Sequence, residues 1–299
     1  MQIHVTMIAT ILLATPIITS LGNVPPEISA GPESETKVEI ITNSIGMKLA
    51  LIPTGKFRMG SPRSEAERES EESQHEVTIT KPFYMGVYEV TQAEYMKLMD
   101  PKNQAHFNSD RGGGAEYPME DVLWTEADEF CRKLTALPDE IRAGRKYRLP
   151  TESEWEYACR AGTTTAFHFG ESISSRQANF NGNFPYGNAE KGQYLRRTVK
   201  VGSYQPNNFG LYDMHGNVAE WCADWYDPDY YDASHDEDPR GPPVGVLSDD
   251  YENYYLVVRG GCWIDDARAC RSAYRHRAMH RNKYRLIGFR VVCEVRAGT

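Results

Sequence analysis

The sequence predicts an α+β domain with little regular secondary structure, and three features lead to this expectation. Capping boxes begin three short helical stretches, at Thr91, Thr125 and Thr151. Short apolar runs with strand character precede the first helix and close the chain. The stretch after Gly162 is rich in Gly, Pro and Asn, which is typical of turns and loops.

Length and composition agree with one ordinary globular domain. The chain has 299 residues, of which 40% are hydrophobic, so it can bury a substantial core. Its net charge of −9 disfavours a nucleic-acid partner, because such a partner needs a basic face that displaces counterions. Six cysteines in a chain of this length do not make a disulfide scaffold. We therefore expect a monomer that does not bind nucleic acid.

The N-terminal residues have the pattern of a targeting segment. The run from Val5 to Leu21 contains no charge, is short for a membrane-spanning helix and is interrupted by Pro16. We therefore predict a cleaved signal peptide at 1–22 rather than a membrane anchor, followed by a Pro-, Gly- and Ser-containing linker at 23–42. The expected location is extracytoplasmic, periplasmic or secreted, where disulfides persist. The domain itself is expected over 43–299.

Four segments before the first helix have readable patterns. Residues 45–53 are strand-like and stop at a Pro-Thr-Gly turn. Residues 61–76 are densely charged and are expected to form a solvated loop. Residues 77–80 alternate like an edge strand, and 83–90 form an apolar and aromatic run.

The three helices begin at the capping boxes. Thr91 and Thr151 are each followed three residues later by Glu, whereas the box at Thr125 has the shorter Asp128 at that place. The third helix is expected to end near Gly162, a residue suited to a left-handed cap. Beyond it, the acidic, Pro- and Gly-rich stretch 227–255 is expected to be a surface insertion.

The segment 258–292 holds the residues with the most chemical interest. Gly260-Gly261 suits a backbone bend, and 288–292 has the pattern of a buried strand. Between them lie Cys262, Cys270 and many arginines. These arginines either line a groove for an acidic or peptide ligand or pair with the acidic loops. They are Arg268, Arg271, Arg275 and Arg277.

An ordered series of motifs covers the chain from about Asn43 to Glu294. In chain order the motifs are Asn43 to Ser61, Arg148 to Arg160, Gly210 to Trp221, Arg259-Gly260-Gly261 and Gly288-Phe289-Arg290. Together they resemble the formylglycine-generating enzyme family, also called the sulfatase-modifying-factor family. The resemblance implies a variant of the C-type lectin fold with low secondary-structure content.

The resemblance also implies a copper oxidase. Active members of the family hold Cu(I) between two cysteines of a Cys-x4-Cys segment, and soft thiolates are the ligands that Cu(I) prefers. A cysteine of a sulfatase joins the metal, oxygen is reduced, and that cysteine becomes formylglycine. A sulfatase or another peptide or protein is therefore the implied partner.

The copper segment of this chain departs from the family pattern. Counting forward from Gly260-Gly261 places the two cysteine positions on Asp265 and Cys270. Counting backward from the following Arg-rich stretch places them on Cys262 and Ala267. Neither register supplies two thiols, and a hard carboxylate is a poor ligand for Cu(I).

Three functional interpretations follow. A divergent, lectin-like binding or accessory protein is the interpretation that the broken pair favours. An active copper-dependent formylglycine-generating oxidase is the alternative implied by the family. A divergent oxidoreductase with Cys262 and Cys270 as a differently spaced catalytic pair lies between the two.

The resemblance also implies two disulfides, one of which would use Cys270 and so compete for a candidate catalytic thiol. Cys131 and Cys293 resemble one bridge, although Cys293 is displaced by two residues along its strand. Cys159 matches half of another, whose partner position is Ser272 in this chain, so that Cys270 becomes a substitute partner.

The resemblance implies structural calcium as well. Asp213, Asn217 and Glu220 match side-chain ligands of the family, and the backbone carbonyl at His215 would complete the site. Oxygen ligands at this spacing suit a hard cation. Asn179, with the Phe180 carbonyl, resembles part of a second calcium site. The competing interpretation of Asp213 is an Asx turn before a capped helix.

Overall fold

The computed structural model describes residues 38–99, 113–247 and 254–295. The predicted signal peptide, 1–22, and most of the predicted linker, 23–42, lie outside these residues. The end of that linker forms strand β1, Ile40–Thr42, which pairs antiparallel with β2, Lys48–Ile52. The folded domain therefore begins before residue 43, the boundary that we expected. Within the described ranges, every helix is too short or too polar to cross a bilayer.

The strands of the described part form three sheets. The remaining strands are β3 Gly55–Met59, β4 His75–Ile79, β5 Phe83–Gly86, β6 Arg145–Arg148, β7 Ala219–Trp225, β8 Tyr255–Arg259, β9 His276–Met279, β10 Ile287–Gly288 and β11 Val292–Val295. One sheet has the order β1-β2-β5-β11-β6, a second has the order β10-β7-β8-β9, and β3 pairs with β4. The predicted strands over 45–53, 77–80 and 83–90 correspond to β2, β4 and β5.

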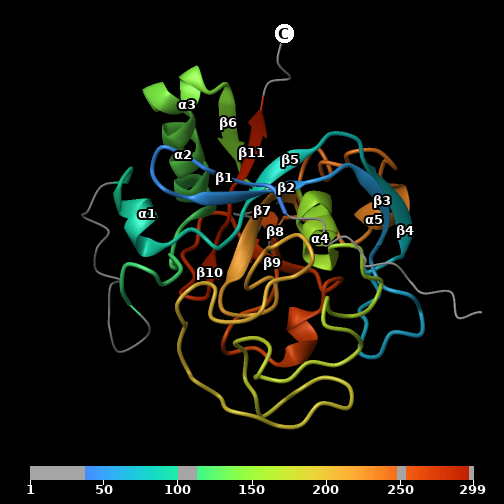
Figure 1. Ribbon diagram of the computed structural model, residues 1–299. Helices are drawn as coiled ribbons and strands as arrows, with labels where there is room; N and C mark the ends of the chain where they lie inside the picture. The colour runs from blue at the N-terminus through green and yellow to red at the C-terminus, as the bar shows by residue number, and fades with distance from the viewer. Residues whose placement is uncertain (1–37, 100–112, 248–253, 296–299) are drawn as a thin grey trace, which may run out of the picture. The chain divides into compact units, whose positions relative to one another are not determined.

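The helices are short and lie around the sheets. They are α1 Gln92–Met96, α2 Trp124–Thr135, α3 Pro138–Arg142, α4 Glu152–Arg160, α5 Tyr230–Ala233 and the 3₁₀ helix η3, Ala267–Cys270. Figure 1 shows α2 and α3 beside β6 at one end of the molecule. Residues 161–218 contain no helix or strand, and in Figure 1 these green and gold segments fill the lower part of the molecule. This confirms the predicted low content of regular structure.

Two of the three capping boxes are confirmed. Thr91 and Thr151 are the N-caps of α1 and α4, and each side chain accepts a hydrogen bond from the amide three residues on. The prediction of a capping box at Thr125 is wrong, because α2 begins at Trp124 and its N-cap residue is Leu123. Glu126 accepts the Leu123 N–H at 2.9 Å, which is the bond that the predicted box assigned to Asp128.

The apolar run 288–292 is divided between two sheets. Gly288 belongs to β10, which pairs parallel with β7, whereas Val292 belongs to β11, between β5 and β6. Arg290, between the two strands, is fully buried and makes two hydrogen bonds to Glu220 of β7, both 2.7 Å long. The end of the chain therefore ties the two larger sheets together.

Two segments predicted to lie on the surface are partly buried. In the charged stretch 61–76, Glu72 is fully buried and pairs with Arg271. In the predicted insertion 227–255, helix α5 buries Tyr231, whose ring lies 4.0 Å from the Arg275 guanidinium carbon. Each of these two side chains contacts an arginine that lies far away in the sequence, which explains why parts of both segments are held inside the fold.

Candidate functional site

The Gly260-Gly261 turn brings the two candidate catalytic thiols near each other. Both glycines follow β8 with left-handed φ angles, 93° and 68°. A Cβ added to Gly261 would lie 2.8 Å from Cys270 Sγ, so η3 packs directly on the turn that precedes Cys262. The thiols are close enough that charge on Cys262 contributes to the raised pKa of Cys270.

Both thiols are buried in surroundings that favour their protonated forms. The Cys262 thiol donates to Asp265 Oδ2 at 3.1 Å, and the Cys262 N–H donates to the same oxygen at 3.0 Å. Burial, and then the Asp265 carboxylate, raise the pKa of both thiols well above the ordinary value. Copper ligation and nucleophilic attack need the thiolate, which this environment disfavours. The surface cavities of about 500 and 400 Å³ are lined by other residues.

The disulfides implied by the resemblance are not formed, since all six cysteines are free thiols in the structure. Cys159 Sγ lies 3.7 Å from Ser272 Oγ, so the two half-cystine positions do meet, but a serine cannot form the bridge. Cys270 does not substitute for it. Cys293 does not bridge Cys131, since both are free thiols.

The predicted calcium ligands lie in one buried region but are engaged differently. Asp213 has φ 57°, its Oδ2 accepts the Gly202 N–H at 2.6 Å, and its Oδ1 is buried without a partner. Asn217 Oδ1 accepts from Val199 N and from Asn179 Nδ2, at 2.9 and 3.1 Å. Asp213 thus has a vacant acceptor, while the Asn217 carbonyl oxygen is already used twice.

Glu220 is bound to a cationic side chain. In addition to its two bonds from Arg290, it accepts from Trp155 Nε1 at 2.8 Å. Phe180, the other predicted contributor, is a buried core residue, and the Asn179 carbonyl accepts the Asn217 N–H at 2.8 Å. In the described parts of the chain, no group of three or more His, Cys, Asp or Glu side chains is arranged to hold a metal ion. The predicted side-chain set therefore fits calcium only in part, at Asp213.

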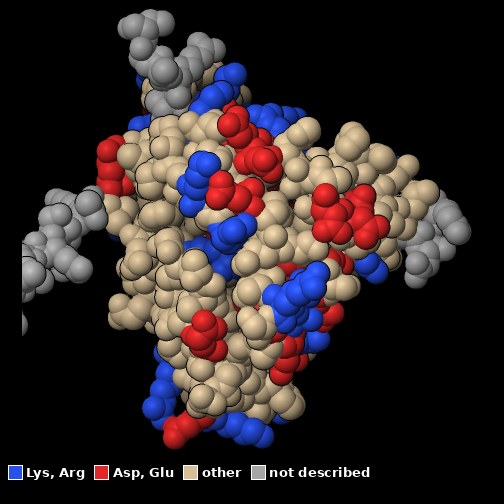
Figure 2. Space-filling view, turned by 90° about the vertical axis from the view of Figure 1, so that its right-hand side faces the viewer, with Lys and Arg blue, Asp and Glu red and all other residues tan. Residues whose placement is uncertain are grey.

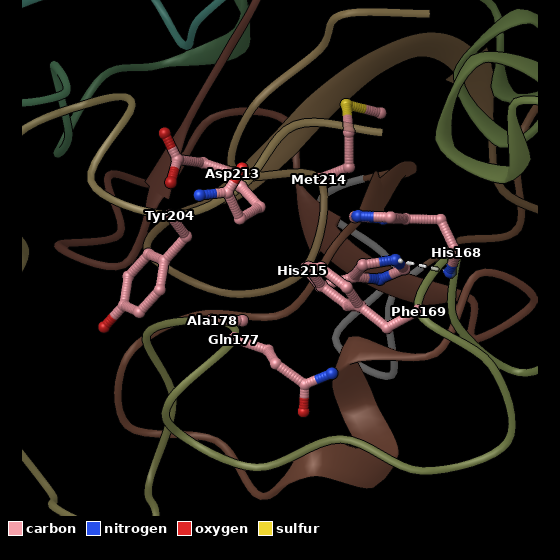
Figure 3. A pocket seen from close by; sticks show the side chains of 9 residues that line it. His168, Phe169, Gln177, Ala178, Tyr204, Asp213, Met214 and His215 are labelled. Atoms are coloured by element: carbon pink, nitrogen blue, oxygen red, sulfur yellow. Dashed lines mark hydrogen bonds between the residues drawn. The ribbon is translucent and has the colours of Figure 1, made fainter. Parts of the chain in front are cut away.

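The ring of His215 faces the thiol region rather than Asp213. Its Nδ1–H donates to the Cys270 carbonyl at 2.7 Å, and its Nε2 accepts the His168 N–H at 3.2 Å. Figure 3 shows the two histidine rings side by side and the Asp213 carboxylate on the other side of the backbone. Burial lowers the pKa of His215 well below its ordinary value. The ring is therefore neutral and fixes η3 against the loop.

Glu89 is a residue of this region that sequence analysis missed. It is buried and accepts from Asn217 Nδ2 at 2.7 Å and from Val218 N at 3.1 Å. Burial, then the Asp213 and Glu220 carboxylates, raise the pKa of Glu89 well above its ordinary value. A single acidic residue inside the apolar run 83–90 was the signal that would have indicated it.

Three of the four arginines expected in a groove are ion-pair partners, and two of these three are buried. Arg271 pairs with Glu65 at 2.6 Å and with Glu72 at 2.7 Å. Arg275 pairs with Glu152 at 2.8 Å. Arg268 pairs with Glu69 at the surface. Of the four arginines, Arg277 alone is left without a carboxylate among the described residues.

Comparison with known proteins places these observations in a family. A family profile described as sulfatase-modifying factor enzyme 1-like domain matches residues 41–295. The chain belongs to this family. Its sheets and loops are the formylglycine-generating-enzyme variant of the C-type lectin fold. PvdO from Pseudomonas aeruginosa has a TM-score of 0.67 and 28% identity, over 86% of this chain and 98% of that one. Treponema denticola variable protein 1 has a TM-score of 0.65 and 25% identity, over 86% and 99%.

Relatives of this sulfatase-modifying-factor domain carry different names. Formylglycine-generating enzyme of Streptomyces coelicolor is 35% identical over 174 residues, which are 56% of this chain and 48% of that protein. Serine/threonine-protein kinase pkn1 of Chlamydia pneumoniae is 32% identical over 275 residues. That match covers 84% of this chain but only 38% of the kinase-named protein. Family membership thus establishes the fold, whereas activity depends on the site.

Proposed function

We propose that this chain is an extracytoplasmic, non-oxidising member of the sulfatase-modifying-factor family that binds a peptide or protein ligand without covalent chemistry. The observation that carries the proposal is the state of the two thiols. Cys262 and Cys270 are buried, and the Cys262 proton is bound to Asp265. Removing that proton would place a thiolate beside a carboxylate in a desolvated site, which is electrostatically unfavourable.

The alternative, an active copper-dependent oxidase acting on a sulfatase cysteine, is favoured by one observation. Cys270 Sγ packs on the glycine turn that precedes Cys262, and Cys262 contributes to the raised pKa of Cys270 despite the unusual spacing of the two. A Cu(I) ion that drew both sulfurs together would have to displace the Asp265 carboxylate, a hard ligand that Cu(I) does not prefer.

A copper titration combined with a peptide assay separates the two functions. Purified protein is titrated with Cu(I) without oxygen against a chromogenic chelator, and then incubated in air with a Cys-x-Pro-x-Arg peptide. We expect no stoichiometric copper binding that depends on Cys270 and no change in peptide mass. Cys270→Ser tests the site, and Cys293→Ser is the matched control outside it. Copper binding lost only in Cys270→Ser, together with conversion of the peptide cysteine to formylglycine, would refute the proposal.

Structural calcium is a separate proposal for the loop around Asp213. The buried, unpartnered Asp213 Oδ1 supports it, and the Arg290 guanidinium on Glu220 opposes it. Thermal unfolding with calcium and with EGTA tests it. A rise in Tm with calcium that disappears in Asp213→Asn would support a bound ion, and equal Tm values would rule it out.

Extracytoplasmic location rests on the pattern of residues 1–22. Fusion of these residues to an alkaline phosphatase that is active only outside the cytoplasm tests export. We expect phosphatase activity, and its absence would contradict this part of the proposal.

A further inference from the structure

A groove of about 400 Å³ opens beside strand β9, and its wall residues Tyr274 and Glu69 contact Arg268 of the predicted copper segment. Three tyrosines line it, Tyr226, Tyr255 and Tyr274, together with Arg277 and two carboxylates, Glu71 and Glu69, the second of which pairs with Arg268. Tyrosine offers contact area at low entropic cost and a polar tip, a combination common in surfaces that bind polypeptides. The groove therefore has walls suited to a peptide rather than to an apolar small molecule.

Arg277 is positioned before any ligand arrives. Its guanidinium carbon lies 5.1 Å from the centre of the Tyr226 ring and 5.0 Å from that of Tyr255. The side chain is exposed, and no carboxylate of the described residues lies within ion-pair distance of it. An arginine already held against two rings loses less conformational entropy on binding than a free one does. Its hydrogen-bond donors are therefore available at low cost.

The neighbouring charges limit which anion would fit. Arg275, also in the groove wall, is already paired with Glu152 through hydrogen bonds of 2.8 and 3.0 Å. The Tyr226 hydroxyl donates to Glu71 and lies 3.5 Å from Arg277 Nη1, so one carboxylate stays close to the free guanidinium. A doubly charged phosphate or sulfate is attracted more strongly by Arg277 and repelled more strongly by this carboxylate, so its second charge gains little here, and it costs more to desolvate than a singly charged carboxylate.

We infer that the groove binds a carboxylate group of a polypeptide segment, with Arg277 as the anchor. This inference rests on the proposed non-covalent binding function and specifies its ligand class. The carboxylate comes from an acidic side chain or from a C-terminus, since both present the same bidentate acceptor to a guanidinium.

Three hexapeptides test the inference on the full chain by NMR, with arginine side chains labelled by ¹⁵N. The first is blocked at both ends and contains one glutamate, the second has glutamine in its place, and the third is the glutamine peptide with a free C-terminal carboxylate. We expect one or both carboxylate peptides to shift the Arg277 Nε–H signal and to bind about 10- to 100-fold more tightly than the uncharged peptide, as for other charge-assisted hydrogen bonds. The tighter of the two identifies the carboxylate source.

Matched variants locate the site. Arg277→Gln should abolish the preference for the carboxylate peptides, whereas Arg281→Gln, an exposed arginine just beyond β9, should leave it unchanged. Inorganic phosphate should bind more weakly than the tighter carboxylate peptide. Glu71→Gln should reduce the difference in affinity between the two, because it removes the nearby carboxylate. Equal binding of the charged and uncharged peptides, no binding of any peptide, retention of the preference in Arg277→Gln, or tighter binding of phosphate would each overturn the inference.

These outcomes are independent of the copper experiment. If the peptides fail to bind in the NMR experiment, the carboxylate groove is refuted, but the proposal that the thiols do not oxidise a substrate is unaffected. If the sulfatase-type peptide is oxidised, the proposed non-oxidising function is refuted, whereas carboxylate binding seen in the NMR experiment would remain valid.

Discussion

Replacing Glu220 by glutamine tests how the two sheets are held together. Glu220 and Arg290 are both fully buried and joined by two hydrogen bonds of 2.7 Å, and Trp155 Nε1 adds a third bond to the carboxylate. Glutamine keeps the volume but places an N–H₂ group against the guanidinium donors. Removing one partner of a buried pair costs about 3–5 kcal/mol, because the other charge stays buried and uncompensated.

The expected loss is large on the scale of the whole domain. At about 2–4 °C per kcal/mol for a domain of this size, Tm should fall by about 6–20 °C. Calorimetry or urea unfolding measures the change. The double variant Glu220→Gln with Arg290→Met should recover part of the loss, because it removes the orphaned charge. Glu116→Gln, which breaks the exposed pair with Lys200, is the control and should leave Tm nearly unchanged.

The same variant distinguishes an ion-pair residue from a calcium ligand. If Glu220 binds Arg290 and Trp155 but no calcium ion, the loss of stability in Glu220→Gln is equal with calcium and with EGTA. A loss below about 1 kcal/mol, or one seen only with calcium present, would refute the reasoning that the guanidinium is its essential partner.

Three further predictions concern local structure. Burial raises the pKa of Cys159 to about 12, so the folded state holds this proton more tightly than the unfolded chain does. The resulting contribution to the unfolding free energy is present below about pH 9 and is lost as the pH rises toward 12. Cys159→Ala should flatten this decline when the unfolding free energy is measured against pH. Thr151→Ala removes a true N-cap and should cost about 1 kcal/mol in urea unfolding, whereas Thr125→Ala, inside α2, should cost nothing or stabilise slightly. Gly261→Ala should lower the unfolding free energy by at least about 2 kcal/mol, because φ is 68° and the new Cβ would lie 2.8 Å from two atoms. Gly162→Ala is the control: its φ is 92° but the space around it is open, so it should cost only the backbone strain of a left-handed alanine. Equal losses in the two variants would contradict the packing argument.

Local patterns predicted local structure well in this chain. The caps at Thr91 and Thr151 are set by side chains three residues apart, so the sequence alone determines them. The box at Thr125 failed because Glu126 forms the same bond from a frame shifted by two residues. The register that forms has only half of the motif, because the Leu123 side chain cannot accept a hydrogen bond, so the motif alone does not decide where this helix begins.

The candidate site was predicted less well, because its chemistry depends on contacts across the chain. The position of Cys270 against the glycine turn follows from how η3 folds back, and no spacing rule indicated it. Glu89 reaches Asn217 across 128 positions. Side chains brought together over such distances are not visible in any window of the sequence.

Charge alone does not distinguish a binding groove from a buried network, and the arginines after Cys270 illustrate the reason. Arg271 and Glu72 are 199 residues apart, and each is harmless to stability only because the other is present. Most of the cationic side chains in this segment form ion pairs of this kind within the fold. Figure 2 accordingly shows positive and negative side chains interspersed on the face drawn, without a large field of one sign. Recognition by charge therefore depends on the few guanidinium groups that the internal pairs leave over, and in the described part of this segment Arg277 meets that condition beside a groove.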